Sequence, residues 1–173
     1  ILGDISITES NFLGKGQEMA LSLTVAALKS EVDISFTEPY FMGREIRAGF
    51  DLFRVSQNLQ SSSSFDTDRT GFGLRGGYLI TESLRQDWRY GFQVSKVSEV
   101  GSAASQLIRN EIGTETTSEI SHILTYDKRD SPLLPTEGYV IRIKNDLAGL
   151  GGSIRHFRNK ITAAKYFPLA DQW

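Results

Sequence analysis

The sequence lacks cysteine, has only four prolines among its 173 residues, and carries almost no excess charge of either sign. The absence of cysteine excludes a disulfide-stabilised scaffold and any thiolate metal site. A formal net charge of −2, with basic residues scattered along the chain, argues against a nucleic-acid-binding protein. No apolar run approaches the roughly 18 residues that a transmembrane helix requires. Membrane barrels show no such run either, so composition leaves that class open.

Apolar residues alternate with small or polar residues along most of the chain, whereas helical periodicity is hard to find. The clearest case is TGFGLRGGYLI (70–80), where apolar side chains alternate with glycines and Arg75. Period-two alternation of this kind is the pattern of a β-strand with two different faces. It predicts nine strands, at residues 4–10, 17–26, 32–36, 45–52, 70–80, 87–95, 119–126, 139–147 and 153–167.

The length of the alternating segments distinguishes two all-β architectures. Strands of soluble β-sandwiches typically have five or six residues, whereas several segments here alternate for about ten, enough for a tilted strand to cross a bilayer. Their polar faces carry Gly, Ser, Thr and charges of both signs, as in a water-filled lumen. We therefore predict an all-β fold, an antiparallel transmembrane β-barrel, with a soluble sandwich as the alternative. The predicted lipid-facing residues are Met19, Leu21, Leu23, Phe72, Leu74, Trp88, Tyr90, Phe92, Ile141 and Ile143.

The connections between predicted strands differ in length. The two longest, at 57–68 and 99–117, would share one side of the barrel, which predicts that they are the outer loops. The shorter connections would then lie on the periplasmic side. Aromatic residues gather near that side, as in a girdle at one membrane interface; they are Phe12, Tyr40, Phe41, Trp88, Tyr126, Tyr139, Tyr166, Phe167 and Trp173.

The segment GFGLRG matches the G-x-G-x-x-G dinucleotide fingerprint at Gly71, Gly73 and Gly76. In nucleotide-binding folds that motif opens a helix, whose N-terminus binds the pyrophosphate. No helix is predicted after it here, because the alternation continues. We interpret the glycines as residues that leave room in the lumen or ease the curvature of the sheet.

The two histidines, His122 and His156, fall in separate predicted strands. Strands far apart in sequence can face one another across a barrel, so a metal site or a serine-hydrolase site is conceivable. Nothing around either residue supports one. His122 alternates with Ile120 and Leu124, which predicts an interfacial or surface position.

The segment DKRDSPLLPTEG (127–138) brings Asp127, Asp130 and Glu137 close together in sequence, as a general acid and base would require. Its two prolines and Gly138 instead favour a turn, with Gly138 at a positive φ. We expect Arg129 to brace this turn by pairing with Asp130 or Glu137. An exposed pair of that kind contributes less than about 1 kcal/mol.

Three motifs, NFLGKGQ (11–17), SFTEPYF (35–41) and YDKRDSPLLPTEGY (126–139), resemble in order and separation those of the barrel domain of the BamA family of outer-membrane protein assembly factors. The resemblance covers essentially the whole chain. It implies that the motifs are periplasmic turns. The residues of this chain that the resemblance assigns to those turns are Asn11, Phe12, Gly14, Gly16, Glu38, Pro39, Tyr40, Phe41, Asp127, Arg129, Asp130, Pro132, Pro135, Glu137 and Gly138.

The resemblance also implies how much of the family's architecture is present. Residues 1–173 would be a partial barrel domain, about nine strands in the N-terminal half of a sixteen-stranded barrel, without POTRA domains, seam strands or the V-R-G-F loop. The chain begins at Ile1 with no visible signal peptide, so we expect an excised piece or a matured product. Two open sheet edges would be costly in hydrocarbon, and we expect the rest of the barrel to cover them.

The function that the resemblance implies is non-enzymatic. Such a protein folds and inserts outer-membrane proteins in the bacterial outer membrane by strand templating at a barrel seam. Its partners would be the lipid bilayer, nascent outer-membrane proteins and, through regions outside this chain, accessory lipoproteins; no cofactor and no nucleic acid are expected. The alternatives are a TamA-like or two-partner secretion barrel, a passive porin-like transporter, and an outer-membrane enzyme.

Overall fold

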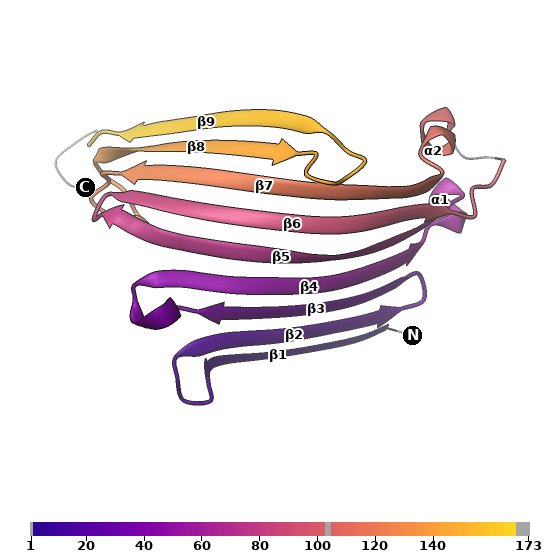
Figure 1. Cartoon of the computed structure of the whole chain (residues 1–173), viewed down its shortest axis with the longest axis horizontal. Coiled ribbons are helices and arrows are strands. Elements are labelled where there is room, and N and C mark those ends of the chain that lie inside the picture. The colour runs from indigo at the N-terminus through magenta and orange to yellow at the C-terminus, as the bar shows by residue number, and fades with distance from the viewer. Residues whose placement is uncertain (1, 103–104, 169–173) are drawn as a thin grey trace.

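Nine antiparallel strands form a single sheet in the computed structural model of the chain, which describes residues 2–102 and 105–168 (Figure 1). Each strand pairs with its neighbours in sequence, in the order β1 to β9. The strands are β1 (Leu2–Phe12), β2 (Gln17–Ala26), β3 (Lys29–Glu38), β4 (Ile46–Asn58), β5 (Asp66–Thr81), β6 (Leu84–Ser98), β7 (Gly113–Asp127), β8 (Gly138–Ala148) and β9 (His156–Tyr166). The predicted all-β antiparallel fold is confirmed.

Seven of the strands are longer than the alternation alone indicates, whereas β2 has the predicted bounds and β9 (His156–Tyr166) is shorter than the predicted 153–167. β5 has 16 residues and β6 and β7 have 15 each. β7 begins at Gly113, whereas the pattern predicted a loop up to residue 117, because GTETTS is polar on both faces and shows no alternation. In the part of the chain that the structure describes, three short helices occupy connections, namely η1 (Phe41–Gly43), α1 (Gln60–Ser63) and α2 (Gln106–Asn110). Within the described residues, none of the helices has the length and hydrophobicity to span a membrane.

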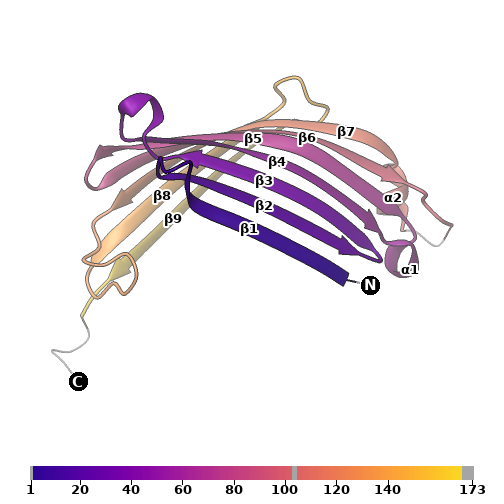
Figure 2. The same cartoon turned by 90° about the horizontal axis from the view of Figure 1, so that it is seen from below.

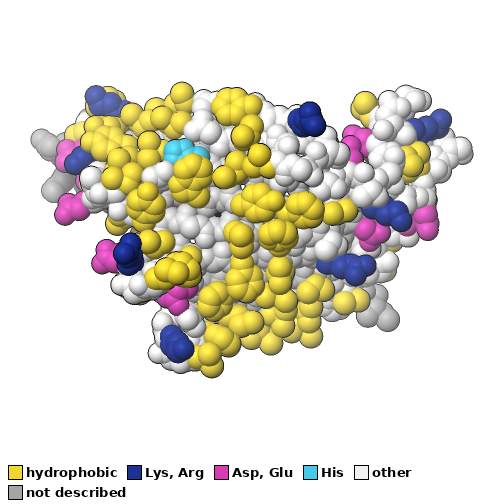
Figure 3. Space-filling view, viewed as in Figure 1, with side chains coloured by type: hydrophobic (Ala, Val, Ile, Leu, Met, Phe, Trp, Pro, Cys, Tyr) yellow, Lys and Arg dark blue, Asp and Glu magenta, His cyan; other side chains and the backbone are white. Residues whose placement is uncertain are grey.

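The sheet is arched, and its apolar face is the convex one, which faces the viewer in Figures 1 and 3 (Figures 2 and 3). Strand register aligns the apolar residues across the sheet, since Phe50 of β4 lies between Phe36 and Leu74, and Leu74 is opposite Tyr90. Aromatic rings stack within this face, with centroids 5.6 Å apart for Phe36 and Phe50. All ten apolar residues predicted to face lipid lie on this face.

No second layer covers the convex face in the part of the chain that the structure describes. Among all the described residues only two hydrophobic side chains are buried, those of Val55 and Ala148, and both lie on the concave face. On the convex face, Phe72, Trp88 and Ile141 are 37%, 43% and 37% exposed. The accessible surface is 12131 Å², against roughly 8,500 Å² for a compact globular protein of this mass. A soluble sandwich would bury these residues between two sheets, so that alternative is wrong.

The concave face carries small and polar side chains, which pack closely against one another. β5 runs through all three glycines of the GFGLRG segment, so no helix follows them. A Cβ atom added at Gly71 would lie 2.7 Å from Cζ of Phe53 and closer still to the carbonyl oxygen of Phe92. Gly71 therefore makes room for the ring of Phe53 on the concave face, which agrees with the structural interpretation of this segment.

Candidate functional site

The three sequence motifs lie at the same end of the sheet. We call this the turn end; it carries the connections 13–16, 39–45, 82–83 and 128–137, at the left of Figure 1. The opposite loop end carries the connections 27–28, 59–65, 99–112 and 149–155. The topology therefore brings together segments that are more than 110 residues apart in sequence.

The first motif forms a tight turn around Asn11. Its side-chain Oδ1 accepts a 2.7 Å hydrogen bond from the backbone N–H of Gly16, and its carbonyl oxygen accepts one of 2.9 Å from Gly14. Both glycines have φ near +69°, a conformation that residues with a Cβ rarely adopt. This explains why the turn requires Asn and Gly at these positions.

The second motif contains a carboxylate that links two turns. Oε2 of Glu38 accepts a 2.6 Å hydrogen bond from the side-chain amide of Gln17, which follows the first turn. Oε1 of Glu38 accepts a 2.9 Å bond from the backbone N–H of Tyr40. The chain then forms η1, in which Met42 has φ +56°. The two hydrogen bonds of Glu38 thus fix the point at which the chain ends β3 and continues towards η1.

The third motif is braced by an ion pair different from the predicted one. The guanidinium of Arg129 donates two hydrogen bonds to Asp127, of 2.9 Å from Nε and 2.6 Å from Nη2, and a third of 3.3 Å to the carbonyl oxygen of Pro132. The predicted pairing with Asp130 or Glu137 is therefore wrong. Hydrogen bonding to Asp127 raises the pKa of Arg129 still further above its already high usual value.

Asp130 instead organises the backbone of the same turn. Its carboxylate accepts hydrogen bonds from the hydroxyl and N–H of Thr136 and from the N–H of Glu137. These bonds, the Thr136 hydroxyl first, lower the pKa of Asp130 to about 2. Because Asp127 is held by Arg129 and Asp130 by Thr136, the geometry gives no support to a general acid–base pair in this segment.

Gly138 closes the third turn at φ +99°, as the sequence predicted. A Cβ atom there would lie 2.9 Å from Cα of Arg129 and closer still to the carbonyl oxygen of Lys128. Backbone, not a mobile side chain, fills the space. The position therefore excludes every residue other than glycine on two independent grounds.

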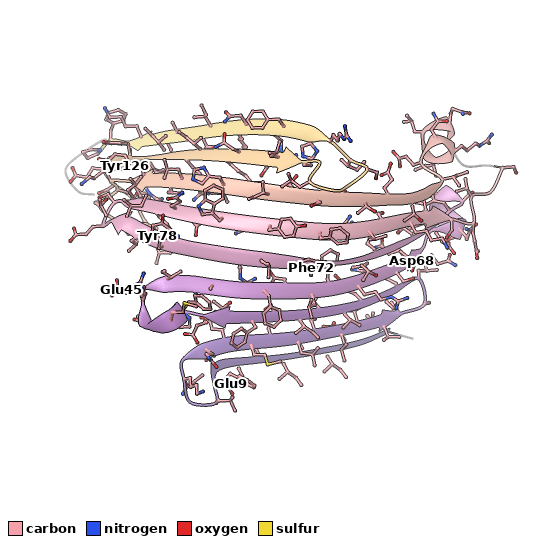
Figure 4. All side chains as sticks on the ribbon, in the orientation of Figure 1. Glu9, Glu45, Asp68, Phe72, Tyr78 and Tyr126 are labelled. Atoms are coloured by element: carbon pink, nitrogen blue, oxygen red, sulfur yellow. The ribbon has the colours of Figure 1, made fainter. Side chains whose placement is uncertain are left out.

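The convex face changes character along β5 (Figure 4). On β5, Asp68 lies towards the loop end, Phe72 near the middle and Tyr78 towards the turn end. The hydroxyl of Tyr78 donates a 2.9 Å hydrogen bond to Gln86, whose amide lies 3.0 Å from Nε2 of His122. At β5 the apolar band is thus bordered by a charged residue at the loop end and by a polar, aromatic zone at the turn end.

Other aromatic residues join that zone at the turn end. The rings of Tyr126 and Tyr139 lie 5.8 Å apart, and that of Trp88 lies 4.4 Å from the ring of His122. The predicted girdle residue Trp173 lies outside the described residues. This arrangement matches the amphipathic rings that membrane interfaces favour.

The two histidines cannot form one site, because they lie on opposite faces of the sheet. His122 shares the convex face with Trp88, whereas Nε2 of His156 is 2.9 Å from Glu119 on the concave face. Across residues 2–102 and 105–168, no group of three or more His, Asp or Glu side chains could hold a metal ion.

The concave face holds a charged cluster that the sequence did not reveal. Asp146 of β8 is 1% exposed and accepts hydrogen bonds from Ser121 on β7 and Arg158 on β9, while Nζ of Lys144 is 2.9 Å away. Its members lie up to 37 residues apart and meet only through the register of three strands. The only signal in the sequence was their shared place on the polar face.

Comparison with known proteins gives a consistent result. Residues 11–173 match the family model described as the Omp85 superfamily domain. The chain is 25% identical over 170 residues to the outer membrane protein assembly factor BamA of Neorickettsia risticii (strain Illinois), covering 98% of this chain and 23% of that protein. It is 25% identical over 147 residues to the human sorting and assembly machinery component 50 homolog, covering 82% of this chain and 30% of that protein.

A solved structure shows the same fold. The crystal structure of BamA from Haemophilus ducreyi lacking POTRA domains 1–3 superposes with a TM-score of 0.72 at 19% identity, covering 98% of this chain and 35% of that one. The present chain therefore spans between about a quarter and a third of the length of these relatives.

Proposed function

The chain belongs to the Omp85 superfamily, and we propose that it forms part of the wall of an outer-membrane β-barrel that folds and inserts other barrel proteins. The observation that carries this proposal is the uncovered convex face. Its apolar side chains are exposed across a sheet only one layer thick. Contiguous apolar surface of this extent is costly in water but suits acyl chains.

The two faces then meet different solvents. The convex face, with its ten predicted lipid-facing residues, contacts the hydrocarbon of the bilayer, and the concave face, with its charged cluster around Asp146, borders a hydrated lumen. The turn end lies at the periplasmic interface, where aromatic rings are favoured, and the loop end lies outside the cell. The short turns and long loops of the sheet support this orientation.

The two edge strands of the sheet support the proposal that these nine strands are part of a larger barrel. β1 pairs only with β2 and β9 only with β8 among the described residues. In hydrocarbon, each unpaired backbone N–H or C=O group costs several kcal/mol. We propose that further strands of the same barrel pair with both edges, and that strand templating takes place at a seam formed outside these nine strands.

The proposed role is non-enzymatic, and the names of the relatives support part of its proposed set of partners. BamA of N. risticii is named an assembly factor of the outer membrane, and the human relative a component of sorting and assembly machinery. We propose a bacterial outer membrane, nascent outer-membrane proteins as substrates, and accessory lipoproteins that bind through regions outside residues 1–173. The periplasmic turns, including the Arg129 brace, would hold adjacent strands in register during that work.

Reconstitution tests this function directly. The full-length protein that contains this chain would be placed in liposomes, and a urea-unfolded outer-membrane barrel protein would be added. We expect faster folding than in empty liposomes, measured by the appearance of the heat-modifiable band in gel electrophoresis. Solute-permeable liposomes without faster folding would instead indicate a porin-like or secretion barrel and would contradict the proposal.

A further inference from the structure

Asn145 of β8 is a polar residue on the convex face of the sheet. Strand register places it opposite His122 of β7 and Asn159 of β9. Its neighbours in sequence, Lys144 and Asp146, belong to the charged cluster on the concave face, so the side chain of Asn145 points away from the lumen. The three residues His122, Asn145 and Asn159 therefore form one polar row across three strands of the outer surface.

On β8 and β9 this polar row lies within the apolar band and not at its border. Towards the loop end, the next convex residue after Asn145 is Leu147, which is opposite Phe157. Towards the turn end it is Ile143, which is opposite Ile161. Figure 3 shows a histidine among hydrophobic side chains on this face. The acyl chains of a bilayer would therefore contact the row directly unless another molecule covers it.

The amide of Asn145 has hydrogen-bonding groups to which the sheet gives no partner. Its Oδ1 accepts a hydrogen bond from Nδ2 of Asn159. A side-chain amide also carries two N–H donors, and those of Asn145 have no partner within residues 2–102 and 105–168. Both strands beside β8 are described, so a further strand of the same barrel cannot supply the acceptor. Acyl chains cannot supply it either, and unpaired polar groups in hydrocarbon are costly.

A second copy of the barrel meets these requirements. Two barrels inserted in the same direction are related by a two-fold axis along the membrane normal, which keeps each residue at its own depth. At that axis Asn145 of one copy faces Asn145 of the other, and the two amides are complementary because each donates and accepts. The side chains around them, those of Leu147, Ile143 and Ile161, are apolar and uncharged, so two like faces do not repel one another.

We propose that the convex face of β7, β8 and β9 is a contact surface between two copies of this barrel in the membrane, with Asn145 at its centre. This inference rests on the proposed function, because it requires the convex face to lie in a bilayer. The arch of the sheet limits the contact to a few strands, since two convex faces separate on either side of the line where they touch (Figure 2). Polar side chains that form hydrogen bonds are a usual feature of contacts within membranes.

Cysteine cross-linking of the full-length protein in liposomes tests the contact. Residues 1–173 contain no cysteine, and any cysteine elsewhere in the protein would be replaced by serine. After oxidation with iodine, we expect at least about tenfold more disulfide-linked dimer from Asn145→Cys than from Leu21→Cys on the convex face of β2, because a specific contact holds the two sulfur atoms at a high effective concentration. Equal yields, or no dimer from either variant, would overturn the contact. A product of any mass other than that of the dimer would indicate a different partner and would also overturn it.

The same two cysteine variants separate a failure of this contact from a failure of the proposed function. A water-soluble maleimide should modify neither variant in liposomes, because both positions would be in hydrocarbon or covered by protein. Modification of both variants would place the convex face in water and would overturn the contact together with the proposed membrane barrel. Protection of both variants without a dimer would overturn the contact alone.

Asn145→Leu tests the hydrogen bonds between the copies. Leucine is favoured in hydrocarbon, so the variant should fold, but it cannot donate or accept across the interface. We expect the dissociation constant of the dimer to rise at least about threefold, measured by energy transfer between differently labelled copies in liposomes. Leu21→Met, on the same face of β2, is the control and should leave the dissociation constant unchanged. An unchanged dissociation constant for Asn145→Leu would overturn the central role of this residue.

Discussion

Oγ of Ser121 donates a 2.5 Å hydrogen bond to Oδ1 of Asp146, on the neighbouring strand of the concave face. The same carboxylate binds Arg158 and Lys144, so one buried charge connects β7, β8 and β9. A charge with 1% exposure is tolerated only because it is paired on several sides. The cluster therefore holds in register the strands that end at the free edge of the sheet.

Removing the carboxylate should destabilise this side of the barrel. Asp146→Ala leaves the ammonium of Lys144 and the guanidinium of Arg158 without their shared partner, and we expect a loss of about 3 kcal/mol in the free energy of unfolding. Urea titration of the full-length protein in lipid vesicles measures it. Lys160→Ala, opposite Lys144 on β9, is the control and should change stability by less than about 0.5 kcal/mol. Equal effects of the two variants would contradict the role of the cluster.

Gly138→Ala tests the third turn. The substituted residue would need φ +99° and would place its Cβ against the backbone of Lys128 and Arg129. We expect a loss of at least about 1–3 kcal/mol from the backbone conformation alone. Gly91→Ala in β6 is a matched control, because no atom lies within 4 Å of its Cβ and its φ is not positive. The measurement is the fraction of folded, heat-modifiable protein in gel electrophoresis. Similar fractions for the two variants would refute the steric argument.

The pKa of the Asp130 carboxyl group should lie well below that of an ordinary aspartate. Its folded pKa is about 2, below the usual 3.8, because it accepts hydrogen bonds from Thr136 and Glu137. A lowered folded pKa contributes stability above pH 3.8 that is lost as the pH falls through about 2. Carboxyl chemical shifts from NMR, with Asp130→Asn to assign the signal, should give a midpoint near 2. A midpoint near 3.8 would mean that the turn is open in solution.

A matched pair of arginine substitutions tests which face meets lipid. Phe92 and Gln93 are adjacent in β6 and lie on the convex and concave faces. Phe92→Arg places a charge in hydrocarbon and should cost about 2–4 kcal/mol of folding free energy in vesicles, whereas Gln93→Arg enters a hydrated lumen and should cost much less.

Phe92 also stacks on Phe72, with ring centroids 5.7 Å apart, so its replacement removes packing as well as adding charge. Phe92→Ala measures the packing part alone. The difference between the arginine and alanine variants is the cost of the charge. A difference near zero, or a larger penalty for Gln93→Arg, would reverse the assignment of the two faces.

The turn motifs show which features can be predicted from residues that are close together in sequence. The positive φ of Gly138 and the strand conformation of GFGLRG follow from residue types and their immediate neighbours, and both were predicted correctly. The partner of Arg129 was not, because Asp127, Asp130 and Glu137 were all within its reach in sequence. Only the folded turn shows that Asp130 is already engaged by Thr136.

The sequence by itself determined the strands, their two faces and the positions of the turns, because side-chain alternation and turn chemistry act over a few neighbouring residues. The tertiary structure alone decided which side chains meet across strands. The cluster at Asp146 and the contact between Gln17 and Glu38 depend on the register of neighbouring strands. Those features arise from interactions between segments distant in sequence, and a local pattern carries no information about them.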